Sequence, residues 1–179
     1  TPFISRTETI YNNENTSYEN PLLPNKIFNL KSTFVKQTNG LEGTSKEIAT
    51  VYNTNNSPTQ ITVTSKKGAT TEKVATQILS YDSITTPYMV DRLTQKNSSA
   101  IIYPSGNTTS SEEVYTYANN LVTQIKKKGD GTDYIIEGNQ YDSFGNIIKK
   151  TLSTTGLTPR VSDFEYDTSG RFLTKKTDI

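Results

Sequence analysis

The feature that most constrains the fold is a short motif, Tyr-Asp-x-x-Gly, which occurs twice without a gap in the C-terminal half of the chain. The two copies are Tyr141-Asp142-Ser143-Phe144-Gly145 and Tyr166-Asp167-Thr168-Ser169-Gly170, 25 residues apart. Asp at the first turn position accepts hydrogen bonds from backbone amides two residues on, and Gly at the fourth adopts the left-handed conformation. Each copy therefore predicts a tight turn between the strands of a β-hairpin.

Three weaker copies of the motif begin at Tyr52, Tyr81 and Tyr117. In the first, Asn53 and Asn56 replace Asp and Gly, and Asn is the residue best able to do the same turn work. The second keeps Asp82 but lacks the Gly, so we expect a different turn there. The third reads Tyr-Ala-Asn-Asn-Leu. The five Tyr, with Asp82, Asp142, Gly145, Asp167 and Gly170, are the predicted structural repeat positions.

A longer duplication lies over the short one. The segment 1–6 (TPFISR) resembles 86–92 (TPYMVDR) at an offset of 85 residues, and Tyr81 precedes Tyr166 by the same distance. Tyr52 precedes Tyr141 by 89 residues. These offsets predict two repeat blocks, 1–85 and 86–179, both belonging to one larger repeat array.

Alternation of apolar and polar residues predicts strands between the turns. The segment 71–81 fits a helix or an alternating strand equally well, and that choice stays open. Strands are also expected in 60–64, 115–117, 121–125 and 162–166. The further candidates are 26–30, 31–37, 46–52, 132–141, 146–153 and 171–177. The predicted fold class is all-β, built from tandem antiparallel hairpins.

The composition favours exposed β-structure and excludes several kinds of catalytic and metal-binding site. Only 31 % of the residues are apolar, and Thr, Ser and Asn together outnumber them. The 11 Tyr and 6 Phe, with a net charge of +1, argue against disorder, which goes with few aromatics and high net charge. The absence of His and Cys excludes Ser-His-Asp and Cys-His catalysis and the usual zinc ligands. We therefore expect no enzyme activity and no cofactor.

The recurring Tyr-Asp-x-x-Gly turn with alternating strands resembles the YD repeat of bacterial RHS proteins, relatives of the toxin-complex shell proteins and of the teneurin barrel. The resemblance is firm over most of 115–179 and reaches the first half only through the internal duplication. It implies a spiral β-sheet of hairpins forming a hollow shell around a C-terminal effector. The self-cleaving core region of that family has no counterpart in this sequence.

The expected function is therefore structural: a shell segment of an exported or cell-surface bacterial protein that encloses or displays a toxin-like effector. Its expected partners are neighbouring repeats of the same polypeptide and such an effector, with neither nucleic acid nor a membrane span. The alternative is a carbohydrate-binding or adhesin module, since Tyr, Asn and Thr on a broad sheet can stack on sugars and hydrogen-bond to them. No segment approaches the ~18 apolar residues that a membrane helix needs.

For the remaining candidate sites, a structural interpretation of the residues is favoured over a functional one. Glu112-Glu113, or the acids Asp130, Asp133 and Glu137, would suit a carboxylate-dependent glycosidase only if held in a pocket. Asp130-Gly131-Thr132-Asp133 lacks the third oxygen position and the closing Glu of a calcium loop. The lysines at 126–128, 149–150 and 175–176 fit the protection of exposed strands better than a nucleic-acid surface. Three glycosylation sequons, at Asn15, Asn97 and Asn107, are expected by chance in this composition.

Overall fold

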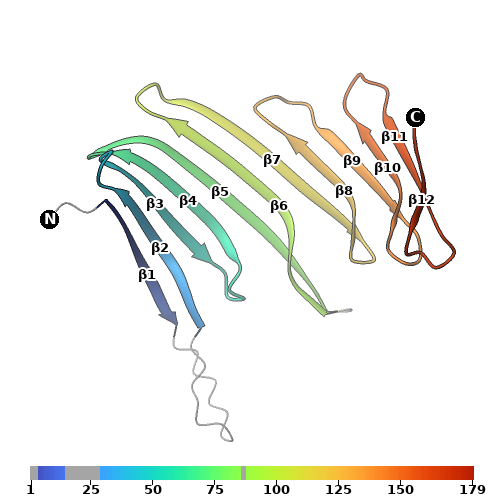
Figure 1. Cartoon of the computed structure of the whole chain (residues 1–179), viewed down its shortest axis with the longest axis horizontal. Helices are drawn as coiled ribbons and strands as arrows, with labels where there is room; N and C mark the ends of the chain where they lie inside the picture. The colour runs from blue at the N-terminus through green and yellow to red at the C-terminus, as the bar shows by residue number, and fades with distance from the viewer. Residues whose placement is uncertain (1–3, 15–28, 86–87) are drawn as a thin grey trace, which may run out of the picture. The chain divides into compact units, whose positions relative to one another are not determined.

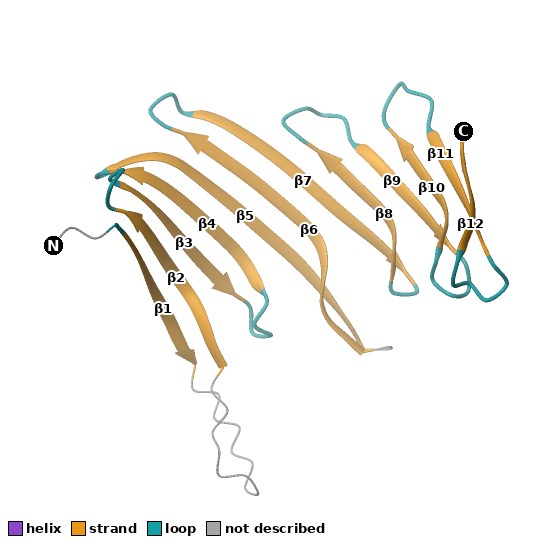
Figure 2. Cartoon of the chain, in the orientation of Figure 1, coloured by secondary structure: helices purple, strands orange, loops and turns teal. Residues whose placement is uncertain are grey.

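The computed structural model describes residues 4–85 and 88–179, except 15–28, and shows strands and turns throughout with no helix in the described part (Figures 1 and 2). The strands are β1 (Ser5–Glu14), β2 (Asn29–Asn39), β3 (Thr44–Tyr52), β4 (Pro58–Lys67), β5 (Thr70–Thr85), β6 (Tyr88–Ile102), β7 (Asn107–Ala118), β8 (Leu121–Lys128), β9 (Ile135–Tyr141), β10 (Ile147–Ser153), β11 (Arg160–Tyr166) and β12 (Leu173–Asp178). The all-β prediction is confirmed.

The twelve strands form one open sheet in which the strand order follows the sequence. The described pairings are antiparallel. The choice left open at 71–81 is settled in favour of a strand, because this segment lies within β5 and pairs with β4 from Gln60↔Ile78 to Lys67↔Thr70. Thr and β-branched residues at alternating positions suit such a strand. The candidate 26–30 lies largely outside the described residues.

None of the described apolar residues is buried. The two described residues that are buried, Lys31 and Asn139, are both polar. Where the described apolar residues all remain partly exposed, the sheet depends on its backbone ladders and on cross-strand side-chain pairs, each pair contributing a few tenths of a kcal/mol to ~1 kcal/mol. Such a pair is Lys36 opposite Glu47, with their charged atoms 3.4 Å apart. This is how a chain with so few apolar residues folds.

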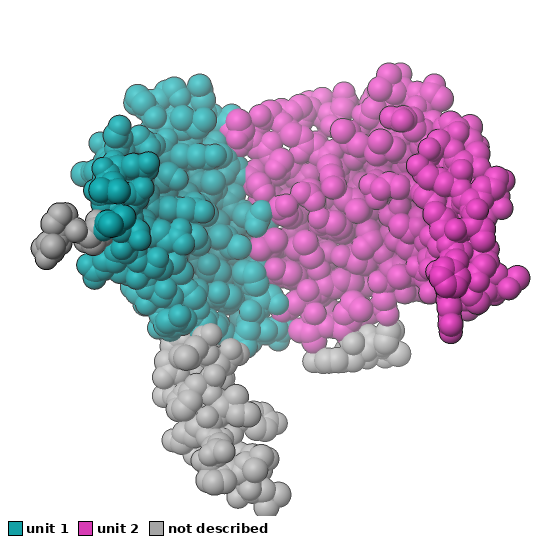
Figure 3. Space-filling view, viewed as in Figure 1, with its two compact units in different colours: residues 1–78, 99–108 teal, residues 79–98, 109–179 magenta. Residues whose placement is uncertain are grey.

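Contacts within the chain define two compact units (Figure 3). The first comprises 1–78 and 99–108, and the second comprises 79–98 and 109–179. The residue blocks 1–85 and 86–179 expected from the internal duplication remain a prediction, and the motif at 1–3 and 86–87 that contributes to it lies outside the described residues.

The repeat offsets correspond to an even number of strands. Tyr52 ends β3 and Tyr141 ends β9, six strands later in the chain. Tyr81 lies in β5 and Tyr166 ends β11, again six strands later. In an antiparallel sheet consecutive strands alternate in direction. Strands that are an even number apart therefore run in the same direction, and the turns that follow them lie at the same edge of the sheet.

Candidate functional site

In both Asp-x-x-Gly turns of the second unit, the Asp carboxylate accepts a hydrogen bond from the amide of the residue directly after the glycine. Asp142 Oδ1 accepts bonds from the amides of Phe144 and Asn146, both at 2.9 Å. Asp167 Oδ1 accepts bonds from the amides of Arg171 and Phe172, the two residues that follow its glycine, at 2.8 and 3.0 Å. Gly145 and Gly170 have φ values of +87° and +68°. Each carboxylate therefore holds its turn closed while the glycine reverses the chain.

The turn after Tyr52, in the first unit, reaches the same geometry with different residues. Asn53 Oδ1 accepts bonds from the amides of Asn55 and Ser57 at 2.9 and 3.0 Å. Asn56, in the position of the glycine, has a φ of +72°. Asn tolerates the left-handed region better than other side chains with a Cβ, so the uncharged version of the motif forms an equivalent turn.

The copies at Tyr117 and Tyr81 differ from this pattern. After Tyr117 the chain reverses over two residues, Asn119 and Asn120, which have φ values of +49° and +65°. Two consecutive positive φ values are typical of a type I′ hairpin turn. No turn follows Tyr81, because β5 continues to Thr85. The expectation of a different turn at Asp82 is therefore wrong in one respect: the residue lies within a strand.

Asp82 takes part in an ion pair of the second unit instead. Arg92 Nε and Nη2 bond to the two Asp82 carboxylate oxygens at 3.0 and 2.6 Å. The Arg92 guanidinium also lies 4.4 Å from the centre of the Tyr117 ring. The bonds from Arg92 lower the pKa of Asp82, and Asp82 in turn raises the pKa of Arg92. This cluster links β5, β6 and β7 side chain to side chain.

Three of the repeat tyrosines donate their hydroxyls to a backbone carbonyl of the preceding strand. Tyr52 bonds to Ser32 O at 3.0 Å, Tyr117 to Leu93 O at 2.7 Å and Tyr141 to Val122 O at 2.6 Å. The rings are half-buried, as is that of Tyr166. In these three hairpins the tyrosine thus ties the strand before the turn to the preceding strand of the sheet.

We expect Tyr141→Phe to lower the free energy of unfolding by about 1 kcal/mol, since Val122 O loses a hydrogen bond in a half-buried place. Urea unfolding followed by circular dichroism measures this. The matched control is Tyr166→Phe, whose hydroxyl has no hydrogen bond among the described residues, and which should change stability by a few tenths of a kcal/mol. Equal effects for the two variants would contradict a tie made by the hydroxyl.

Successive turns of the second unit also contact one another. The amide of the Asn146 side chain donates to Gly170 O at 2.8 Å. A Cβ built on Gly170 would lie 2.5 Å from Phe144 Cδ2, so the Phe144 ring rests directly on the next turn. Leu121, at the end of the β7–β8 turn, approaches Gly145 in the same way at 4.0 Å. The β7–β8, β9–β10 and β11–β12 turns therefore contact one another in a row along one edge of this unit.

The adjacent acids Glu112 and Glu113 do not face one another, because neighbouring residues of a strand point to opposite faces of the sheet. Glu112 accepts a hydrogen bond from Tyr134 and pairs with Lys128 at 3.2 Å, and both lower its pKa. The pKa of Glu113 is lowered by Tyr115 and then by Lys96, 3.0 Å away. Both carboxylates are thus ionised partners of cations, without the raised pKa that a general acid needs.

The other acidic candidates are also dispersed. Asp130 accepts hydrogen bonds from the Ser110 amide and hydroxyl, which joins the β8–β9 loop to β7. Asp133 is exposed, and Glu137 pairs with Lys150 at 2.9 Å. Within the described residues no three acidic side chains come together as metal ligands. The calcium-loop interpretation gains no support from this geometry.

The lysines expected to protect exposed strands are mostly paired with acids on neighbouring strands or within a strand. These ion pairs are Lys128–Glu112, Lys149–Asp163, Lys150–Glu137, Lys175–Glu165 and Lys176–Asp178. Charges that alternate in this way leave no continuous basic stripe over these strands. Of the sequons, Asn97 lies in β6 and Asn107 begins β7, while Asn15 is outside the described residues.

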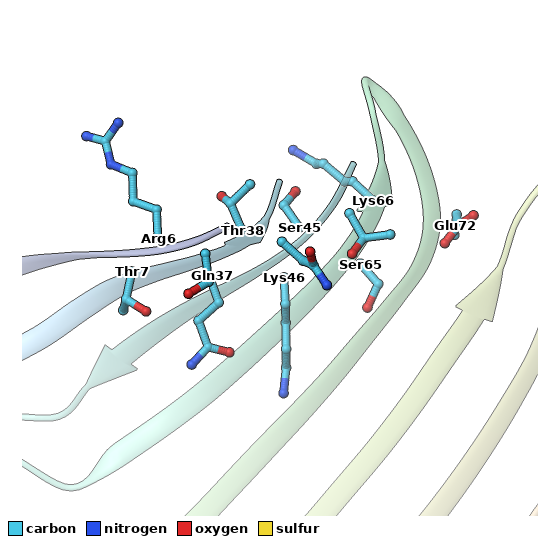
Figure 4. Close-up of a pocket in the computed structure, with 12 residues that line it drawn as sticks. Arg6, Thr7, Gln37, Thr38, Ser45, Lys46, Ser65, Lys66 and Glu72 are labelled. Carbon is cyan, nitrogen blue, oxygen red and sulfur yellow. The ribbon is translucent and has the colours of Figure 1, made fainter. Parts of the chain in front are cut away.

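A polar groove of about 480 Å³ lies at the strand ends of the first unit (Figure 4). Its side chains form two cross-strand rows that point to opposite sides of the sheet, as Figure 4 shows: Arg6, Thr38, Ser45 and Lys66 in one, Thr7, Gln37, Lys46 and Ser65 in the other. None of these side chains is buried. The groove is therefore the exposed rim of a sheet, without the desolvated polar groups of a typical small-molecule site.

Sequence reasoning missed Arg92, Phe144 and Asn146. Two signals were available in the first full motif: the aromatic Phe144 at the third turn position, and the side-chain amide of Asn146 directly after the glycine. In the second full motif these positions hold Ser169 and Arg171, so the comparison of the two copies did not identify them.

Comparison of the chain with models of known protein families and with curated proteins finds no match. Among the described residues, no helix has the length and apolar character required to cross a membrane.

Proposed function

We propose that this chain is a structural wall segment of an RHS-like YD-repeat protein that is exported or displayed at a bacterial cell surface. In this proposal the sheet is part of a larger spiral shell that encloses or presents a C-terminal effector. The observation that carries it is the row of turns in contact with one another, two of them anchored by a Tyr hydroxyl, along a sheet in which none of the described apolar residues is buried.

Repeat architecture explains why such a sheet is useful without a site of its own. Each hairpin contacts only its neighbours, so stability is the sum of many small interface terms and the sheet can be extended strand by strand. Its end strands β1 and β12 each have one neighbour among the described strands. Unpaired edges of this kind invite further strands, which supports a place in a larger sheet.

The use of the tyrosines also favours a wall over a glycan-binding surface. Three tyrosine hydroxyls donate hydrogen bonds to backbone carbonyls within the sheet: those of Tyr52, Tyr117 and Tyr141. A sugar-binding platform needs aromatic faces and hydroxyls directed to solvent. The internal hydrogen bonds of these three residues give them a structural use.

The test is cryo-electron microscopy of the natural protein that contains these residues, combined with limited proteolysis. We expect both β1 and β12 to pair with further strands of the same polypeptide, and a C-terminal segment to resist proteases until the shell is opened by denaturant. A protein in which β1 and β12 pair with no other part of the polypeptide would contradict the proposal. Specific binding on a glycan array, with the edges unpaired, would support the adhesin instead.

A further inference from the structure

We propose that Asn39, at the end of β2, is a site of spontaneous covalent modification whose rate is controlled by strand β1. The reaction is succinimide formation, in which the backbone nitrogen of the next residue attacks the asparagine side chain. The product is aspartate or isoaspartate in place of asparagine. Every group involved belongs to the first unit, so the site is independent of the proposed wall.

Asn39 is intrinsically the most reactive asparagine of the chain. The attacking nitrogen must approach the side-chain carbon Cγ, and any side chain on the following residue hinders this approach. Glycine has no Cβ and adopts the widest range of backbone angles. Asn39 is the only asparagine in the sequence that is followed by glycine. In the unfolded chain it should therefore react first.

The reaction needs no partner except water. The Gly40 nitrogen gives up its proton and bonds to Asn39 Cγ, and the bond between Cγ and Nδ2 breaks. The leaving amide takes up a proton and departs as ammonia. Water then opens the ring at one of its two carbonyls. Opening at Cγ leaves aspartate in a normal chain, whereas opening at the backbone carbonyl leaves isoaspartate, with Gly40 bonded to the former side chain.

Three hydrogen bonds restrain the reacting groups in the folded chain. The Gly40 amide donates to Ile4 O at 3.0 Å. The amides of Leu41 and Glu42 donate to Asn39 Oδ1 at 3.1 and 3.3 Å and fix the side chain over the turn. Since a hydrogen-bonded amide gives up its proton only when the bond opens, the Gly40 nitrogen cannot attack while β1 is in place. The bonds to Oδ1 lie at an exposed turn, so the bond to Ile4 is the stronger restraint.

Strand β1 controls the hydrogen bond of the Gly40 nitrogen. Its first residue, Ser5, stands opposite Asn39, and the bond between Gly40 and Ile4 closes the ladder just beyond this pair. On its other side Asn39 stands opposite Thr44 of β3. Separation of β1 from this end of β2 therefore frees the Gly40 amide while β2 and β3 stay paired. Local openings of this kind cost less free energy than global unfolding, so the folded chain reacts through them.

Asn53, in the turn after Tyr52, is an internal control. Its Oδ1 accepts two backbone amides at 2.9 and 3.0 Å, much as Asn39 Oδ1 does. The residue that follows it is Thr54, whose branched Cβ crowds the backbone nitrogen. Asn53 should therefore stay unmodified over the period in which Asn39 reacts in the unfolded chain.

The two products affect the fold differently. Aspartate at position 39 keeps a side-chain oxygen for the turn amides, in the way that Asp142 does in its own turn. Isoaspartate places an extra carbon in the main chain between positions 39 and 40. The Gly40 amide then cannot reach Ile4 O while Ser5 stays opposite position 39. This product should release this end of β1 irreversibly.

The test is peptide mass spectrometry of the full 179-residue chain during incubation at mildly alkaline pH. In guanidinium chloride, Asn39 should be converted before any other asparagine. In the folded chain its conversion should be at least ~10-fold slower, because only opened molecules react. Equal rates in the folded and the unfolded chain overturn control by the fold. Faster conversion of another asparagine in the unfolded chain overturns the choice of site.

Two proline variants test the role of β1. Starting from the bond between Ile4 and Gly40, inner and outer residues alternate along β1, so the Arg6 amide points toward β2 and the Thr7 amide points away from it. Arg6→Pro removes a hydrogen bond of the β1–β2 ladder next to the site and should speed conversion in the folded chain roughly 10-fold. Thr7→Pro keeps that ladder and should leave the rate unchanged. Equal rates for the two variants overturn control by β1.

The wild-type chain provides the same test if Arg6→Pro does not fold. In guanidinium chloride below the unfolding transition, hydrogen exchange of the Gly40 amide, measured by NMR, and conversion of Asn39 should accelerate by the same factor. Conversion that stays constant while exchange accelerates contradicts control by β1. Gly40→Ala is the control for the chemistry, since its Cβ hinders the nitrogen and should slow conversion in the unfolded chain by ~10-fold or more.

Discussion

Gly170→Ala is expected to be among the most destabilising single substitutions in the chain, lowering the free energy of unfolding by about 2–4 kcal/mol. Two costs add. Ala must adopt a φ of +68°, which is strained for any residue with a Cβ. That Cβ would also lie 2.5 and 2.7 Å from two atoms of the Phe144 ring, so the ring must leave its position on the turn. Urea unfolding monitored by circular dichroism measures the total.

Two further glycines separate the two costs. Gly145→Ala meets the strain of a φ of +87°, but its nearest neighbour is Leu121 Cδ1 at 4.0 Å. Gly156→Ala has a φ of +75° and nothing within 4 Å. Both should cost about 1 kcal/mol. In the double variant Phe144→Ala/Gly170→Ala, the effect of the second change should fall to that same level. If Gly170→Ala costs no more than Gly156→Ala, the turns are not in close contact.

The hairpin architecture was predictable from sequence because its signals are local. An Asp or Asn that caps its own turn, and a Gly or Asn at positive φ, act within five residues, as at Asn53 and Asn56. The helix alternative at 71–81 could not be decided in this way. It depended on whether β4 lies beside the segment, and pairing between strands is a tertiary effect.

The contacts between turns were not predictable for a related reason. Asn146 and Phe144 act on Gly170, 24 and 26 residues away, and the sequence carries no spacing rule for such a contact. At Tyr81 the local sequence predicted a turn that the structure does not contain. Its local sequence, Tyr-Asp-Ser, is that of a turn, but Asp82 bonds to Arg92 and β5 continues through it. The partner of Asp82 lies 10 residues further on, in the next strand, so the local sequence did not indicate it.

The second large expected effect is a loss of stability in acid. Every described carboxyl group whose pKa departs from its usual range is shifted downward: Glu47, Asp82, Glu112, Glu113, Asp142, Asp167 and Asp178. For Asp167 the main causes are bonds from Ser169 and Phe172. For Asp142, desolvation is the largest single influence and raises the pKa, but the bonds from Asn146, Phe144 and Gly145 together outweigh it.

The sign follows from linkage. A carboxyl group whose pKa is lower in the folded than in the unfolded chain stabilises the fold above its unfolded pKa of about 4, and this contribution disappears as the pH falls through the folded pKa. The urea midpoint should therefore decline progressively below about pH 4, with all seven groups acting in the same direction.

Between about pH 5 and pH 9 the midpoint should be nearly constant, because the chain has no His or Cys side chain to titrate there. At the alkaline end, desolvation and then Glu113 raise the pKa of Tyr115 to about 12. A group with a raised folded pKa stabilises the fold below its unfolded pKa of about 10 and loses that effect as the pH rises through the folded value. Stability should therefore fall again above about pH 10.

Asp142→Asn distinguishes titration of a turn from general acid unfolding. Asn keeps the side-chain oxygen that accepts the Phe144 and Asn146 amides, as Asn53 does in its own turn, but it carries no titrating proton. At neutral pH this variant should be less stable than wild type by about 1 kcal/mol, because an Asn side chain cannot accept the 3.0 Å bond that Asn146 Nδ2 donates to Asp142 Oδ2. It should lose less stability than wild type on acidification. Asp133→Asn, at an exposed loop residue, should leave the acid limb unchanged. If the two variants follow the same curve, Asp142 does not contribute to the acid sensitivity, which then lies with the other six carboxyl groups of lowered pKa.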